Sequence, residues 1–403
     1  MFMIIYGIAF VVFACAWYLL RIDDGGQSES PMWLLTFIIV SGVIFRATLI
    51  PTEPSTSDDY YRYVWEGKLI ANGYNPYEYA PGDTALAHLH SNMLPANVTF
   101  KKMTTIYPPA AQVVFTAAYI IGGESSRGLK IIFLLAEICT MLLMGSLLKH
   151  LKMNTNLVLL YAWLPLTVME YMINAHIDVA ALPFFLVFII CVLKEKPLPA
   201  AVMFAFCFMM KSYAIFALPL MWYRISWKKI LVFIPVVVVF VVLAYIPFLN
   251  SRHHITEMLS TYLTNWEFNG SFYNAFKLFT LNGIVLRFLC LGLLGISTLY
   301  ITLRIKLPLY KLTLIYISVV ACTTTVYPWY LGWLAVLLPF TEFYSVAILF
   351  FMINLTNITP YGQVWREHYD IIGIEYLVFY MFLVYDLKRH KNELWSPVME
   401  KTN

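Results

Sequence analysis

Long apolar stretches, each close to the length that crosses a lipid bilayer, recur along this chain of 403 residues. Residues 2–20, 32–50, 229–249 and 283–303 are the clearest, because a helix needs about 20 apolar residues to span the hydrocarbon core. Hydrophobic residues make up 61% of the sequence and charged residues only 12%, whereas soluble domains carry about 25% charged residues. The sequence therefore predicts an all-α, polytopic transmembrane protein.

The apolar segments give about thirteen candidate spans. They are 2–20, 32–50, 129–148, 156–173, 177–193, 198–210, 213–223, 229–249, 283–303, 308–325, 330–341, 343–358 and 371–386. The segments 198–210 and 213–223 are too short for ordinary spans, which indicates a helix broken near Lys211. No repeat or low-complexity tract divides the chain, so we expect one integral-membrane domain over residues 1–403.

Basic residues cluster between or after the apolar segments, at 149–152, 194–196, 224–229, 304–306 and 388–391. Because cytoplasmic loops carry an excess of lysine and arginine, these clusters predict the orientation of the chain. Residues 51–106 then form a long extracytoplasmic loop that we expect to be catalytic, and 250–281 a second one. This assignment requires 107–122 to be re-entrant or to lie in the membrane interface.

The net charge of +4 is explained by topology and does not indicate a nucleic-acid partner. We therefore expect a multi-pass protein of the cell membrane, in contact with the lipid bilayer, whose chemistry takes place on the extracytoplasmic side.

The first loop begins with SDDYYRYVWEGKLIANGYNPY (57–77), which has the pattern of an amphipathic helix over 59–71. At about 100° per residue, polar side chains share one face and apolar or aromatic side chains the other. The first face comprises Asp59, Arg62, Tyr63 and Glu66, and the second comprises Tyr61, Trp65 and Leu69. Such a helix suits the membrane surface. Asp58 and Asp59 are also typical helix caps, so the doublet alone does not identify a catalytic group.

Further polar residues are predicted at the same membrane face. His176 and Asp178 lie between two apolar segments, where they could form an acid–base pair, a metal site or a loop tether. Lys211 must reach the interface, pair with an acid or bind an anion, and a lysine suits a phosphate. The segments TIYPPAAQ (105–112) and TVYPWYLGW (325–333) have the composition of an aromatic belt.

The chain has no G-x-G-x-x-G, Walker A, H-E-x-x-H or G-x-S-x-G motif, so nothing indicates a soluble nucleotide substrate. An acid on a surface helix, a cation at membrane depth and long lipid-facing helices together suit a lipid-linked phosphate donor. The partner in such a reaction would be a hydroxyl acceptor just outside the membrane.

The motifs SDDYYRYVWEG, GYNPY, YPPAAQ, NAHID, KSY and YPWY occur in an order that resembles the GT-C superfamily of integral-membrane glycosyltransferases, over residues 30–341. The chain is most similar to bacterial polyprenyl-phosphate-mannose-dependent mannosyltransferases. In that family an Asp in a D-x-x-x-Y pattern of the first loop is the catalytic base. Asp59 and Tyr63 match this pattern, and Asp58 is the alternative. The family's H-N-D motif reads His176-Ile177-Asp178 here, and its His before Pro-Trp-Tyr is replaced by Tyr327.

The resemblance implies inverting transfer of a hexose, mannose in this family, from a polyprenyl-phosphate donor to a hydroxyl group of a glycan, glycolipid or protein. On this hypothesis Lys211 and Arg62 bind the donor phosphate. The expected substrate-binding residues are His176, Asp178, Tyr63, Glu66, Gln112, Tyr213, Trp329 and Tyr330. No cofactor is demanded, although His176 and Asp178 leave room for a divalent cation. The alternative function is a transporter or flippase of lipid-linked sugars, but the chain has no second half that repeats the broken segment near Lys211.

Overall fold

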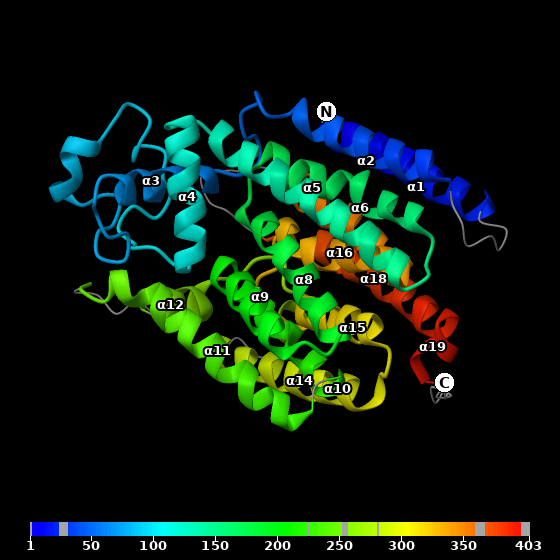
Figure 1. Ribbon diagram of the computed structural model, residues 1–403. Helices are drawn as coiled ribbons and strands as arrows, with labels where there is room; N and C mark the ends of the chain where they lie inside the picture. Colours follow the sequence, from blue (N-terminus) through cyan, green and yellow to red (C-terminus); the bar gives the residue numbers. More distant parts are fainter. Residues whose placement is uncertain are drawn as a thin grey trace.

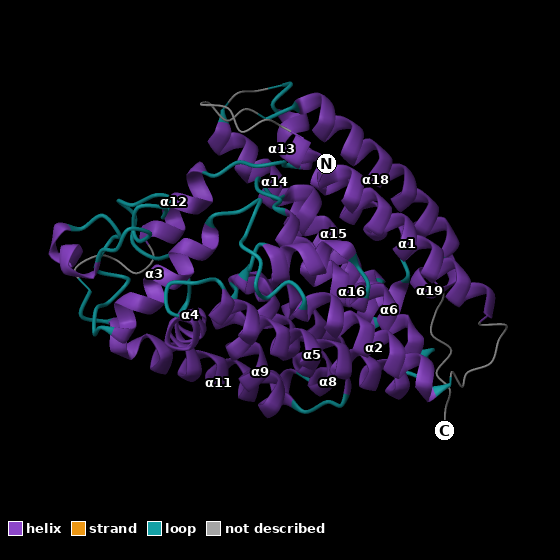
Figure 2. Ribbon diagram, turned by 90° about the horizontal axis from the view of Figure 1, so that it is seen from above, coloured by secondary structure: helices purple, strands orange, loops and turns teal. Residues whose placement is uncertain are grey.

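The computed structural model describes residues 2–23, 31–224, 226–251, 257–279, 282–358 and 367–395. Within these residues the protein is all-helical and has no strand (Figure 2). Of the second predicted loop, residues 252–256 and 280–281 lie outside the described residues.

The helices fall into three groups by length. The longest are α1 (Phe2–Asp23), α5 (Arg127–His150), α11 (Trp227–Tyr245), α14 (Gly283–Arg304) and α18 (Tyr369–Arg389). Intermediate helices are α2 (Met32–Ala47), α3 (Asp59–Ala71), α4 (Pro109–Gly122), α8 (Leu182–Leu193), α9 (Pro197–Met210), α15 (Pro308–Cys322), α16 (Gly332–Thr341), α17 (Tyr344–Met352) and α12 (Glu257–Asn265). Short helices are α6 (Leu159–Ala162), α7 (Pro165–Thr167), α10 (Met221–Arg224), α13 (Ser271–Phe276) and α19 (Lys391–Trp395).

Short 3-10 and π-helical turns connect these helices. They are η1 (Thr84–Leu89), η2 (Thr155–Val158), η3 (Val168–Ile173, a π-helical turn), η4 (Ile177–Ala181), η5 (Ser212–Leu220), η6 (Ile246–Phe248), η7 (Pro328–Leu331) and η8 (Ile353–Ile358). As expected from the sequence, the chain breaks at Lys211, which is extended between α9 and η5 with φ −149° and ψ 118°.

Among the described residues, the helices Phe2–Ile22, Arg127–His150, Lys228–Phe248 and Gly283–Arg304 are long and apolar enough to cross a membrane. A fifth span is formed if Thr155–Ala162 and Pro165–Ile173, which are bent by 49°, count as one. Pro165 begins the second half, and a proline has no N–H to continue the hydrogen bonding of the preceding helix. Several further apolar helices have only 10–17 residues. The structure therefore does not confirm about thirteen spans.

Helix α4 runs across the direction of α5 (Figure 1) and is seen nearly end-on in Figure 2. Its first residue is Pro109, whose fixed φ favours a helix start, and it ends before Gly123, which has a positive φ of 61°. A helix across the bundle suits the sequence requirement that 107–122 not be an ordinary span.

A buried ion pair joins α2 to the centre of the bundle. Nε of Arg46 lies 2.9 Å from Oε2 of Glu137 in α5, and both side chains are fully buried. Arg46 also donates to the carbonyl oxygen of Ala162 and to Oγ1 of Thr167. These bonds attach α2 to the bent α6–α7 segment, where the break leaves backbone carbonyls free to accept.

Helix α3 covers the predicted range 59–71. We expected its aromatic face to meet lipid, but that face is covered by protein. Trp65 and Leu69 are buried, and the Trp65 ring packs edge-on against His90 of the first loop. Gly67 explains the close packing on the other side, since a Cβ there would lie 2.2 Å from the carbonyl oxygen of Phe115 in α4. The first loop therefore folds around α3 and fixes the direction of its N-terminus.

Candidate active site

Segments far apart in the sequence meet at the N-terminus of α3. They are the start of α3, the turn before η4, the break after α9, and η7. The side chains brought together are Asp59, His176, Asp178, Lys211, Tyr213, Trp329 and Tyr330. All of them were candidate residues in the sequence, and the structure places them in one cluster.

Asp59 and Asp58 have different surroundings. Asp59 is the first residue of α3, its side chain is 33% exposed, and Oδ2 lies 3.7 Å from Nδ1 of His176. Asp58 occupies the N-cap position and is exposed, but its side chain makes no capping hydrogen bond. Burial, together with the negative charge of Asp58, raises the pKa of Asp59 to about 6, although Lys211 and Arg62 act in the opposite direction.

Lys211 is a partly exposed cation next to this carboxylate. Its Nζ lies 2.9 Å from Oδ2 of the buried Asp178 and 5.1 Å from the centre of the Tyr330 ring. The ring of Tyr107, just before α4, lies 5.9 Å away. The Lys211 side chain is 16% exposed, and a lysine ammonium group suits an anion such as a phosphate.

The cluster does not fit a divalent cation. Asp178 already accepts a hydrogen bond from Lys211, and that ammonium group would repel a metal ion held by the same carboxylate. Within the described residues, no group of three or more His, Cys, Asp or Glu side chains could hold a metal. The prediction that His176 and Asp178 leave room for a metal therefore gains no support from the donor set.

His176 is held between an aromatic ring and two acids. Its ring stacks on Trp329 with centroids 3.6 Å apart. Nε2 lies 3.5 Å from Oε2 of Glu170, a buried residue of η3 that our sequence reasoning missed. The available signal was an acidic residue inside the apolar stretch 156–173, since ionisable groups at membrane depth are costly.

Two tyrosines line the cluster beside Lys211. The rings of Tyr213 and Tyr330 lie 5.2 Å apart, and the hydroxyl of Tyr330 shares a hydrogen bond of 2.7 Å with the hydroxyl of Tyr262 in α12. Tyr262 was not among the residues predicted from the sequence. It brings the second loop to the cluster.

A second group of predicted residues forms the core of the first loop. Arg62 pairs with Glu66 at 3.2 Å and donates to the carbonyl oxygens of residues 99, 100 and 103. Glu66 accepts from Nε2 of Gln112 at 2.7 Å, and burial raises its pKa. Tyr63 is fully buried and stacks on the ring of Phe115. These contacts give the four residues a role in folding the loop, and their contact with substrate stays a prediction.

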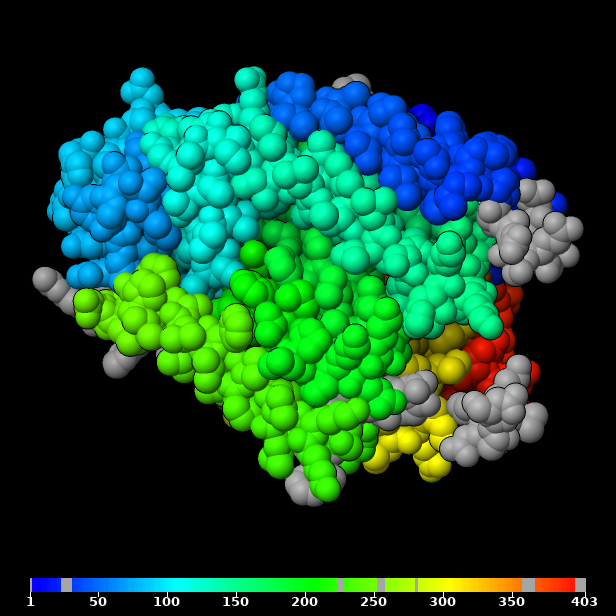
Figure 3. Space-filling model, in the orientation of Figure 1, coloured from blue at the N-terminus to red at the C-terminus, as the bar shows by residue number. Residues whose placement is uncertain are grey.

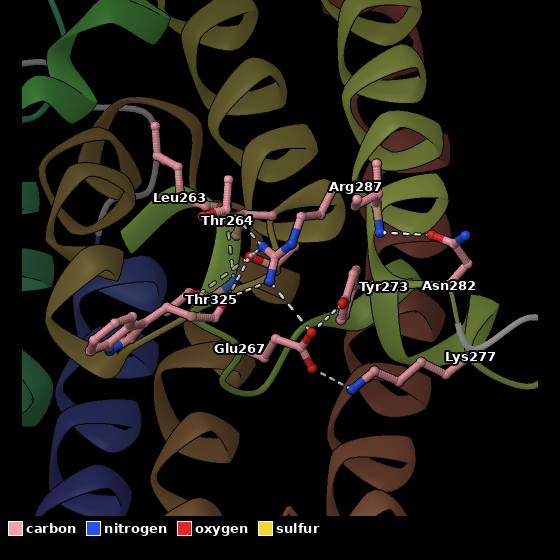
Figure 4. A network of polar contacts seen from close by, with 12 residues as sticks. Leu263, Thr264, Glu267, Tyr273, Lys277, Asn282, Arg287 and Thr325 are labelled. Atoms are coloured by element: carbon pink, nitrogen blue, oxygen red, sulfur yellow. Dashed lines mark hydrogen bonds and ion pairs between the residues drawn. The ribbon is translucent and has the colours of Figure 1, made fainter. Parts of the chain in front are cut away.

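The second loop is fastened by a polar network around Glu267, shown in Figure 4. Arg287 of α14 donates to Oγ1 of Thr324 at 2.9 Å and lies 3.4 Å from Glu267. Glu267 also accepts from Tyr273 and from Lys277. The network holds α12, which lies beside the first loop in Figure 3. Directly after α12, the ring of Trp266 lies 4.8 Å from the ring of Phe100 in the first loop.

An open apolar cavity of about 500 Å³ lies between α4, α9 and α11. Its lining includes Pro109, Val113, Phe206, Met209 and Phe248. Met209 is two residues before Lys211, and Pro109 is two residues after Tyr107, so the cavity begins close to the cluster.

A comparison with protein families decides what the chain is. The family model described as alpha-(1->6)-mannopyranosyltransferase, N-terminal domain, matches residues 1–226, which is more than half of the chain. The chain belongs to this family. As a mannosyltransferase it fits the resemblance seen in its motifs, and the matched residues include Asp59, His176, Asp178 and Lys211. No curated protein matches the mannosyltransferase.

Proposed function

We propose that this mannosyltransferase moves mannose from a polyprenyl-phosphate donor to a hydroxyl group of a glycan, glycolipid or protein, with Asp59 as general base. The observation that carries the proposal is that the part-exposed carboxylate of Asp59 and the part-exposed side chain of Lys211 lie in one cluster. A base and a cation are the two groups that displacement of a phosphate from a sugar needs.

In the proposed step, Asp59 accepts the proton of the acceptor hydroxyl as its oxygen attacks C1 of mannose. The bond from C1 to the acceptor oxygen forms, and the bond from C1 to the phosphate oxygen breaks. The polyprenyl phosphate leaves with the electron pair, and Lys211 stabilises its growing negative charge. Attack opposite the leaving group inverts C1, so a β-linked donor gives an α-mannoside. The proton on Asp59 then passes to water.

The apolar cavity between α4, α9 and α11 supports a lipid-linked donor. A phosphate held at Lys211 would place an attached isoprenoid chain near Pro109 and Met209, where the cavity begins. Val113 and Ile120 of α4, which line the cavity, have exposed side chains, so the cavity is open on this side. A soluble sugar nucleotide would gain nothing from such a surface.

The orientation is also part of the proposal. The ends of α5, α14 and α18 that lead into the basic segments 149–152, 304–306 and 388–391 lie away from the first loop (Figure 1). If these segments face the cytoplasm, the cluster around Asp59 faces the extracytoplasmic side of the cell membrane.

The test uses purified protein in lipid with labelled polyprenyl-phosphate mannose and a mannoside acceptor. We expect the wild type to form labelled product and D59N to lose activity by about a hundredfold or more, since general bases contribute about 10²–10⁴. D58N is the matched control and should retain most of the rate. Transfer by D59N at the wild-type rate would overturn the assignment of the base. Movement of the donor across vesicles without transfer would favour the transporter.

A further inference from the structure

Glu170 is a buried acid that faces His176, and His176 in turn faces the proposed base Asp59. Glu170 has no role in the proposed transfer step. It lies in the π-helical turn η3, and such turns are frequent at functional sites. Its side chain is 2% exposed, and among the described residues it pairs with no lysine or arginine. Its partners are Nδ2 of Asn174 at 3.1 Å and the His176 ring. A buried acid without a cation partner is costly, so its retention needs a reason.

The two ring nitrogens of His176 face two different acids. Nδ1 lies 3.7 Å from Oδ2 of Asp59, and Nε2 lies 3.5 Å from Oε2 of Glu170. Stacking on Trp329 fixes the plane of the ring. Neither nitrogen has a hydrogen-bond partner among the described residues, and these two acids are the charged groups that face them, so they decide which nitrogen carries the proton.

The protonation state of His176 limits which of its two ring nitrogens can donate a hydrogen bond. Burial and the charge of Lys211 lower the pKa of His176 well below its ordinary value, so the ring is neutral. A neutral imidazole has one donor and one acceptor nitrogen. An ionised Asp59 can only accept, so Nδ1 must carry the hydrogen. Nε2 is then an acceptor, and the group that faces it must donate.

We propose that Glu170 is a positioning residue for the base: its carboxyl group keeps a proton, donates it to Nε2 of His176, and so fixes the tautomer whose Nδ1–H faces Asp59. This inference rests on the proposed role of Asp59. When the 3.7 Å between Nδ1 and Oδ2 closes to a hydrogen bond, Nδ1–H favours the ionised form of Asp59 and holds the carboxylate in one orientation toward the acceptor.

Other charged and titratable groups surround the line of contacts from Asp59 through His176 to Glu170. Those that act on Asp59 besides His176 are Asp58, Arg62, Asp178 and Lys211, with the hydroxyls of Tyr63, Tyr107 and Tyr262 nearby. Those that face Glu170 besides His176 are Tyr6, Asn174, Asp178 and Tyr171. The variants below leave all of these groups in place.

The test compares E170Q and E170M by the dependence of kcat/KM on pH. The amide of E170Q can still donate to Nε2, so we expect a rate within about twofold of the wild type and an unchanged acid limb. E170M cannot donate. We expect its kcat to fall about tenfold with little change in KM, and its acid limb to move up by about one pH unit, because Asp59 loses a stabilising hydrogen bond.

E375M is the matched control, since Glu375 is an equally buried acid that bonds to Asn269 and has no contact with His176. Its acid limb should stay in place. The proposal is overturned if E170M keeps the wild-type acid limb, or if E170Q moves the limb to lower pH, which would mean that Glu170 is ionised. The E170Q result stands even if E170M does not fold. Wild type and D59N in the same assay report separately on the proposed function.

Discussion

At the scale of single residues, Asp58 and Asp59 differ because the first precedes helix α3 and the second begins it. Asp58 remains outside the helix as an exposed N-cap, whereas Asp59 is turned toward His176 and is partly buried. The sequence motif favoured Asp59 through Tyr63 four residues later, and the surroundings in the structure favour the same residue. An acid that is partly desolvated, yet reachable, is suited to accept a proton near neutral pH.

The raised pKa of Asp59 predicts a pH dependence. The base works only as a carboxylate, so kcat/KM should fall about tenfold per pH unit below about pH 6 and level off above it. In D58N the limb should move to lower pH, because the like charge that helps to raise the Asp59 pKa is gone. The measurement is a pH profile of both proteins with saturating acceptor. A limb near pH 4 in the wild type would contradict the raised pKa.

The sequence could predict which residues share a helix face, but not what that face meets. Helical periodicity correctly grouped Arg62 with Glu66, which form an i, i+4 pair. It could not show that Arg62 is also engaged by carbonyl oxygens of the same loop, because those contacts span about 40 residues of irregular chain. Trp65 was expected to face lipid for the same reason, since hydrophobicity does not distinguish lipid from a folded loop.

At the scale of elements, the cluster depends on how α12 and η7 are held. An isolated β-bridge joins Phe268 of the second loop to Thr325, in the segment that leads to Trp329. Arg287 of α14 links the same two segments, because it pairs with Glu267 and donates to Thr324. This arrangement was beyond sequence reasoning, because the partners lie about 20 to 60 residues apart.

We predict that R287M lowers kcat/KM about tenfold, because the second loop loses bonds to two backbone carbonyls and to Thr324. K277M is the control. It removes an ion pair whose side chains are 22% and 32% exposed, and such pairs contribute about 1 kcal/mol or less. The measurement is the steady-state transfer rate of both variants. Equal effects of the two substitutions would mean that the network acts only through charge near the site.

The pair of Arg46 and Glu137 gives a prediction about stability. R46M leaves Glu137 buried without its cation, so we expect a loss of about 3–5 kcal/mol. The double variant R46M/E137L removes both charges and should recover most of this loss. The fraction of monodisperse protein after heating in detergent measures the effect. A double variant as unstable as R46M would show that the bonds of Arg46 to Ala162 and Thr167 matter more than the ion pair.

At the scale of the whole molecule, the basic segments 149–152, 304–306 and 388–391 lie at one end, and the first loop with the cluster around Asp59 lies at the other (Figure 1). The sequence predicted that the loop 51–106, His176 and the segment 325–333 share one membrane face, and the structure brings Asp59, His176 and Trp329 of these parts together. The number of spans was harder to predict, because bent and short apolar helices inside a bundle have the same composition as ordinary spans. If an even number of spans is miscounted between two loops, the side of the membrane predicted for each loop does not change.

The orientation can be tested by cysteine labelling in intact cells. Ala87 in η1 of the first loop and Lys391 at the start of α19 are both exposed. The first loop and α19 lie at opposite ends of the molecule (Figure 1). We expect a membrane-impermeant maleimide to label A87C in intact cells, and K391C only after the cells are opened, because we propose that the basic end faces the cytoplasm. The unsubstituted chain is the control, since its six cysteines all lie in apolar segments. The opposite labelling pattern would place the cluster around Asp59 on the cytoplasmic side and require a donor presented there.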